Sequence, residues 1–116
     1  MLKQKRLEVS EVGDVTVVHF RDQRIIEALG IQETGQELVE LVDEGRTKIL
    51  LNFSAVGFMS SAALGKLITL NKKVQAAGGV VKMCSIRPEI REVFVITRLD
   101  RLFDIKEDES EALAAF

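Results

Sequence analysis

Hydrophobic and polar residues alternate at the start of the chain in the pattern of a β-hairpin. Leu7-Glu-Val9 alternates apolar with polar side chains, Gly13-Asp14 forms a tight-turn pair, and residues 15–20 resume as a second run rich in β-branched side chains. A period of two is typical of strands, and a Gly-Asp pair between two such runs favours a tight turn. We therefore expect residues 7–20 to form two strands joined by a turn.

The middle of the chain alternates between helical and strand patterns. A helix over about 32–44, ending at Gly45, is predicted by apolar side chains that share one helical face: Ile31, Leu38, Leu41 and Val42. Residues 48–53 are almost continuously apolar, as in a strand covered on both faces, so we expect this strand at the centre of the sheet. A second helix is predicted by a stripe at steps of four and three: Ala63, Leu67, Leu70, Val74 and Ala77.

The last third of the chain continues this alternation. Gly78-Gly79 ends the second helix, and residues 80–84 form a strand that a right-handed crossover places parallel to the central one. Pro88 suits the first position of a third helix, which turns Ile90, Val93 and Phe94 inward. Residues 102–105 are predicted to form a short strand. Asp108 and Glu111 resemble a capping box that opens a last helix through Ala112, Ala115 and Phe116.

The element order is therefore β-β-α-β-α-β-α-β-α, which belongs to the α/β class. We expect a mixed sheet, made of the opening hairpin and parallel crossovers, with about four helices packed against it. The 116 residues suit one domain, and neither a linker nor a repeat divides them, so a single domain is expected over residues 1–116.

Composition narrows the range of partners. The chain has 16 Lys and Arg against 18 Asp and Glu, for a net charge of −2, and its charges are interspersed instead of forming blocks. It has no Trp or Tyr and six Phe, so neither an electrostatic nor a stacking surface for nucleic acid is expected. No apolar run is long enough to cross a bilayer, and no signal peptide follows the basic start. We expect a cytoplasmic protein without nucleic-acid or membrane partners.

Signatures of catalysis are missing from the sequence. Residues 56–62 have one glycine and two bulky residues where a dinucleotide-binding turn needs glycines, and there is no Walker sequence or Gly-x-Ser-x-Gly elbow. His19, the single histidine, is interpreted as an imidazole lodged at a sheet face or strand end. Cys84, in an apolar strand, is interpreted as an inert core thiol. We expect neither an enzyme nor a metal site nor a cofactor.

Two hydroxyls stand between a buried strand and the second helix. Ser60 and Ser61 lie within residues 58–65, at a position where α/β sheets present their sites. A serine at a helix start is usually a cap whose oxygen accepts a backbone N–H, and this explains one serine. The other hydroxyl is therefore expected to lie at the surface. Phosphorylation there would be tolerated by the fold and would add negative charge where a partner binds.

The whole chain resembles the STAS domain, and within it the bacterial anti-sigma-factor antagonists. The resemblance covers the hairpin, residues 49–54, the 58–65 motif, the helix ending at Gly79, residues 80–85, and residues 86–94 before 102–105. In such antagonists the motif usually reads Asp-Ser-Ser/Thr-Gly-Leu-Gly, and an anti-sigma factor that is a serine kinase phosphorylates the serine after the aspartate.

The resemblance implies roles for individual residues of this motif. Ser61 corresponds to the phosphorylated serine, with Ser60, in place of the aspartate, as a second candidate, and Leu64-Gly65 matches the end of the motif. Ala62 replaces the next hydroxyl residue and Ala63 the glycine. The implied partner surface comprises the motif and the exposed side of the second helix: Ser60, Ser61, Ala62, Leu64, Gly65, Lys66 and Lys72. For each lysine singly, a solvated helix face is the alternative interpretation.

The resemblance also implies partner switching. The unphosphorylated antagonist binds an anti-sigma factor with serine kinase activity and so releases a sigma factor, whereas the phosphorylated form lets go. ATP belongs to the kinase, so no cofactor is expected in this chain, and a serine phosphatase is a further implied partner. Because the aspartate and the glycine are missing, a constitutive scaffold or a nucleotide-sensing STAS domain in a signalling assembly is the alternative hypothesis.

Overall fold

The computed structural model describes residues 6–116, which form a five-stranded sheet, a separate pair of short strands and four α-helices. The sheet has the order β1-β2-β4-β6-β7, so β4 lies at its centre as predicted. Its strands are β1 (Leu7–Val12), β2 (Val15–Phe20), β4 (Lys48–Asn52), β6 (Val80–Cys84) and β7 (Asp104–Lys106). The helices are α1 (Ala28–Asp43), α2 (Ser61–Ala76), α3 (Pro88–Ile96) and α4 (Glu109–Ala114).

The sheet is mixed, which confirms the predicted fold class. β1 and β2 pair antiparallel from Leu7↔Phe20 to Val12↔Val15, around Gly13 at a φ of +61°. β2, β4, β6 and β7 then pair in parallel, joined by helical crossovers. The residues with alternating polarity therefore form the predicted hairpin, and the continuously apolar residues form a central strand with a neighbour on each side.

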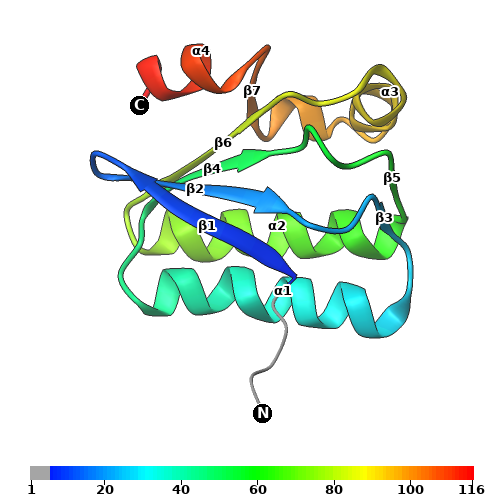
Figure 1. Cartoon of the computed structure of the whole chain (residues 1–116), viewed down its shortest axis with the longest axis horizontal. Helices are drawn as coiled ribbons and strands as arrows, with labels where there is room; N and C mark the ends of the chain where they lie inside the picture. The colour runs from blue at the N-terminus through cyan, green and yellow to red at the C-terminus, as the bar shows by residue number, and fades with distance from the viewer. Residues whose placement is uncertain (1–5) are drawn as a thin grey trace.

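Two apolar layers lie on opposite faces of the sheet. α1 and α2 run side by side along one face, and α4 lies on the other side (Figure 1). The larger core contains Phe53, which packs against the rings of Phe20 and Phe94 with centroids 4.9 and 6.1 Å away. The smaller core, on the α4 face, comprises Val15, Val17, Leu50, Cys84 and Ala112. The face covered by α1 and α2 is thus the principal hydrophobic layer, and α2 carries the surface described below.

The first helix begins earlier than its apolar pattern predicts. α1 starts at Ala28, four residues before the expected start at residue 32. Its N-cap is Glu27, which makes no side-chain cap, and Gly30 lies in its first turn, so capping and propensity signals for this start are weak. The Glu37 carboxylate accepts the backbone N–H groups of Arg6 and Leu7 and ties the helix to β1.

Three predictions near element ends are wrong. Ala77 follows the end of α2 and is exposed, because Gly78 (φ +79°) already turns the chain away. The strand predicted over residues 102–105 begins only at Asp104, because a 3₁₀ turn at Leu99–Arg101 precedes it and leaves Leu102 exposed. α4 is capped by the Asp108 carboxylate, which accepts the Glu111 N–H at 2.8 Å, but it ends at Ala114, before Ala115 and Phe116.

A second, two-stranded sheet was not predicted. β3 (Arg24–Ile25) and β5 (Phe58–Met59) pair in parallel, with Arg24 opposite Phe58 and Ile25 opposite Met59. Strands of two residues are too short to show alternation, so no periodicity indicates them. This small sheet fixes the chain immediately before α2, where the paired serines lie.

Candidate protein-binding site

Ser60 is the N-cap of α2. Its Oγ accepts the backbone N–H of Ala63 at 3.2 Å, and its carbonyl accepts the N–H of Leu64 at 3.1 Å. Its own N–H donates to the carbonyl of Ile25 at 3.1 Å, which fastens the helix start to β3. The half-buried Ser60 hydroxyl therefore has a structural task, the one that serine commonly performs at this position.

Ser61 differs from Ser60 in its exposure. It is the first residue of α2 and lies at the surface. Upstream, the N–H of Gly57 donates to the carbonyl of Gln23 at 2.8 Å, so both sides of the junction are held by backbone hydrogen bonds to the β3 segment. The junction presents one accessible hydroxyl on a well-anchored backbone, at the positive end of a helix macrodipole.

The other motif residues differ in what they offer to a partner. Ala62 is exposed, and Gly65 is half-buried, with no atom within 4 Å of the position of a Cβ apart from its chain neighbours and its own helix backbone. Leu64 is 5% exposed and belongs to the larger core, so the expectation that it contributes to the binding surface is wrong for its side chain. The 3.6-residue period explains the difference, because Leu64 lies one turn before the buried Leu67 and two turns before the buried Asn71.

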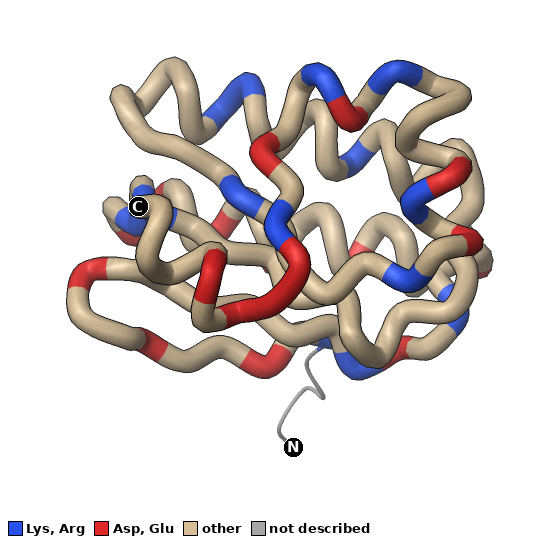
Figure 2. The backbone as a smooth tube through the Cα atoms, turned by 90° about the horizontal axis from the view of Figure 1, so that it is seen from above, with Lys and Arg blue, Asp and Glu red and all other residues tan. Residues whose placement is uncertain are grey.

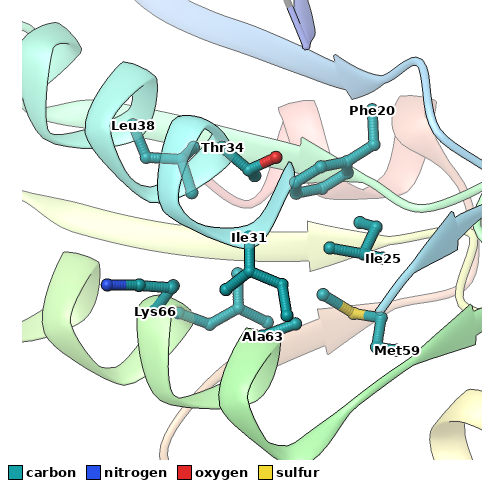
Figure 3. A pocket seen from close by; sticks show the side chains of 9 residues that line it. Phe20, Ile25, Ile31, Thr34, Leu38, Met59, Ala63 and Lys66 are labelled. Carbon is teal, nitrogen blue, oxygen red and sulfur yellow. The ribbon is translucent and has the colours of Figure 1, made fainter. Parts of the chain in front are cut away.

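Lys66 and Lys72 both lie on the exposed side of α2, but Lys66 is packed more closely. The aliphatic stem of Lys66 crosses Gly35 of α1, where an added Cβ would lie 2.7 Å from Lys66 Cδ. The stem also lines a narrow apolar crevice with Ile31, Ala63 and Met59, and its ammonium points away from the other lining residues (Figure 3). The Lys66 side chain therefore combines a structural stem with a charged head at the surface.

Charge is distributed unevenly along the chain. No Asp or Glu occurs between Glu44 and Glu89, whereas Lys66, Lys72 and Arg87 lie in this interval. The prediction of interspersed charge is therefore wrong for the segment that contains β5 and α2. Acidic residues lie instead on the opening hairpin, in and beside α1, and around β7 and α4 (Figure 2). A count of charges over a sliding window would have revealed this basic segment.

His19 and Cys84 lie away from the paired serines, on the α4 face of the sheet. His19, Asn52 and Cys84 occupy one row across β2, β4 and β6. Glu109 Oε1 lies 3.3 Å from His19 Nε2 and accepts a hydrogen bond from Asn52 Nδ2 at 3.1 Å. Burial raises the pKa of the Cys84 thiol, which keeps it protonated and weakly nucleophilic. His19 thus lies at a strand end and Cys84 in the core, as predicted.

Neither a metal cluster nor a membrane span is found within residues 6–116. The described His, Cys, Asp and Glu side chains form no group of three that could hold a metal ion. None of the described helices has the length and apolar character needed to cross a membrane. The exposed serine and its basic surroundings remain the principal candidate site.

Replacing Ser60 by alanine is expected to lower the free energy of unfolding by about 1 kcal/mol, because the Ala63 N–H loses its cap. Ser60→Asp is the matched control, since a carboxylate caps the same N–H and favours the positive helix end. Urea unfolding of both variants measures the difference. Equal destabilisation by Ala and Asp would contradict the capping role.

Comparisons with known proteins agree with this fold. The STAS domain family model matches residues 6–112. The chain is 27% identical over 94 residues to BtrV of Bordetella bronchiseptica, named as a candidate anti-sigma factor antagonist, with 81% of each chain covered. It superposes on an anti-sigma-factor antagonist (STAS) domain protein from Planctomyces limnophilus with a TM-score of 0.85 at 22% identity, covering 97% of this chain and 98% of that one. The phosphorylated form of SpoIIAA, a Bacillus cell fate determinant, gives a TM-score of 0.72 at 19% identity, covering 94% and 97%.

Proposed function

The chain belongs to the STAS domain family, and from this premise we propose that it is an anti-sigma factor antagonist controlled by phosphorylation of Ser61. In this proposal the unphosphorylated chain binds an anti-sigma factor with serine kinase activity, and the sigma factor is released. Phosphorylation dissociates the complex, and a serine phosphatase restores binding. We place this exchange in the cytoplasm, with ATP bound by the kinase.

The observation that carries the proposal is the division of roles between two adjacent serines. Ser60 caps α2, whereas Ser61 is exposed on the same anchored backbone. A kinase can reach the Ser61 hydroxyl without opening the helix. Two similar proteins also support the proposal: BtrV is named as a candidate anti-sigma factor antagonist, and SpoIIAA is known in a phosphorylated form.

Charge explains how one phosphate would switch binding without switching the fold. A phosphoserine carries about −1.5 to −2 charges, which a helix N-terminus favours by roughly 0.3–1 kcal/mol at an exposed position. A partner pressed against the same hydroxyl instead meets a new anion, and mismatched charge in an interface costs several kcal/mol. The free chain therefore tolerates the phosphate and the complex does not.

The test is capture of the tagged chain from its native cells, followed by identification of the bound protein and intact mass of the chain. We expect an anti-sigma factor to bind the unphosphorylated form, and one phosphate to appear when the captured kinase receives ATP. Ser61→Ala should abolish this phosphate, whereas Ser60→Ala should still accept it. These variants form a matched pair, since each removes one hydroxyl from the same junction.

Two outcomes would contradict different parts of the proposal. If an anti-sigma factor binds but neither serine accepts phosphate, control by phosphorylation is refuted and the function as an antagonist still stands. If the chain captures a signalling assembly that contains no anti-sigma factor, the proposed function as an antagonist is refuted.

A further inference from the structure

An open cavity of about 360 Å³ lies beside the paired serines, between the small β3–β5 sheet and the start of α3. Its lining comprises Gln23, Arg24, Gly57, Phe58 and Arg87. Phe58 is 50% exposed, although it is a large apolar side chain. Both arginines are also exposed. The cavity thus combines two guanidinium groups with an accessible aromatic ring.

Local contacts hold both arginines at this cavity. The guanidinium carbon of the exposed Arg24 lies 5.7 Å from the centroid of the Phe58 ring, within the range of a cation–π interaction. Arg87 Nε and Nη2 donate to the carbonyl of Ser54 at 3.4 and 3.2 Å. Arg87 Nη1 lies near Gly57, 3.5 Å from the position that a Cβ would occupy. Donors are therefore oriented before any ligand arrives.

The two guanidinium groups are not paired with a carboxylate at this cavity, although Arg24 also lines a neighbouring hollow with Asp22 and Glu27. None of the lining residues is acidic, and no ion pair joins Arg24 or Arg87 to a carboxylate within the described part of the chain. Elsewhere Arg6 binds Asp22 and Glu33, and Arg46 binds Glu11. Because a guanidinium fork matches the two oxygens of a carboxylate, the cavity is suited to an anion from outside the chain.

We propose that this cavity receives a carboxylate side chain from an acidic segment of a protein partner, with an apolar neighbour of that carboxylate resting on Phe58. The inference rests on the proposed function, because it assigns the cavity to the anti-sigma factor that covers Ser61. Phe58 and Ser61 are three residues apart, so their Cα atoms lie within about 11 Å. A standard interface of about 800 Å² per partner covers both.

A peptide titration tests the cavity without the natural partner. The probe is a capped Glu-Leu-Glu-Leu peptide, and its Gln-Leu-Gln-Leu counterpart controls for apolar contact. We expect the ¹⁵N-labelled chain to show saturable shifts at the Gly57 and Phe58 amides with the acidic peptide only. The variant Arg24→Gln/Arg87→Gln should weaken this binding at least tenfold, and Arg24→Lys/Arg87→Lys should weaken it less, since lysine keeps the charge but loses the fork.

The control variant is Arg98→Gln/Arg101→Gln, which removes the same charge from two exposed arginines that do not line the cavity. It should bind the peptide as the native chain does, and thermal melts should show all variants folded. If Arg98→Gln/Arg101→Gln loses as much peptide affinity as Arg24→Gln/Arg87→Gln, the effect is one of net charge and the proposal is overturned. Binding of inorganic phosphate but not of the acidic peptide would also overturn it, since the site would then select phosphate.

A second experiment tests the cavity with the anti-sigma factor that is captured with the native chain. Arg24→Gln/Arg87→Gln should weaken its binding at least tenfold without preventing phosphorylation of Ser61. Unchanged affinity in this variant would overturn the cavity assignment and leave the antagonist function standing. If no anti-sigma factor is captured while the peptide binds as expected, the proposed function and the assignment to that partner fail together, and the acidic-segment site remains.

Discussion

Replacing Ser61 by glutamate is expected to weaken binding of the anti-sigma partner by about 100-fold or more, while the fold stays intact. A charge facing a partner surface without a complementary group costs several kcal/mol, and each 1.4 kcal/mol corresponds to a factor of ten in affinity. In the free chain the same carboxylate stands at the N-terminus of α2, where negative charge is favourable. Calorimetric titration of the partner measures the affinity, and urea unfolding should change by less than about 0.5 kcal/mol.

Ser61→Gln separates the charge from the size of the new side chain. Glutamine has nearly the shape of glutamate but no charge, so its affinity for the partner should fall much less. Similar losses for both substitutions would mean that bulk at this position, and not a negative charge, disrupts the complex. Unchanged affinity in both would place Ser61 outside the interface and contradict the proposed switch.

The sheet could be predicted from the sequence because its signals are local and repeated. The alternation in residues 7–20 and the apolar run at 48–52 each extend over several residues, and the structure pairs them as β1, β2 and β4. β3 and β5 lack such a signal, because each has two residues and is defined by a partner more than thirty residues away. Long-range pairing of very short segments leaves no trace in local periodicity.

The candidate site could be predicted in part. The family motif and the two hydroxyls locate the junction, and N-capping predicts that one serine is structural, but only the folded structure assigns the cap to Ser60. The cavity beside it depends on Arg24, Phe58 and Arg87, which come from three separate segments. Arg24 reaches Phe58 through the unpredicted β3–β5 pairing, so the aromatic and basic residues could not be grouped from the sequence.

Replacing Gly79 by alanine is expected to destabilise the chain by about 1.5–4.5 kcal/mol. An added Cβ would lie 2.7 Å from Thr47 Cβ and 2.8 Å from the Thr47 carbonyl carbon, both closer than van der Waals contact allows. The backbone cannot separate freely, because the Thr47 carbonyl accepts the Val80 N–H at 2.8 Å and the next residues begin the β4–β6 pairing. Overpacking costs about 1–3 kcal/mol, and a broken hydrogen bond adds about 0.5–1.5 kcal/mol.

Gly65→Ala is the matched control for this prediction. Gly65 lies inside α2, and apart from its chain neighbours and its own helix backbone no atom lies within 4 Å of the position of a Cβ. Alanine should therefore stabilise the chain by about 0.5–1 kcal/mol through helix propensity. The same substitution therefore shifts stability in opposite directions at two glycines. Thermal and urea unfolding measure both shifts. If Gly79→Ala were as stable as the native chain, the close approach of Gly79 to Thr47 would not constrain the junction between α2 and the central strands.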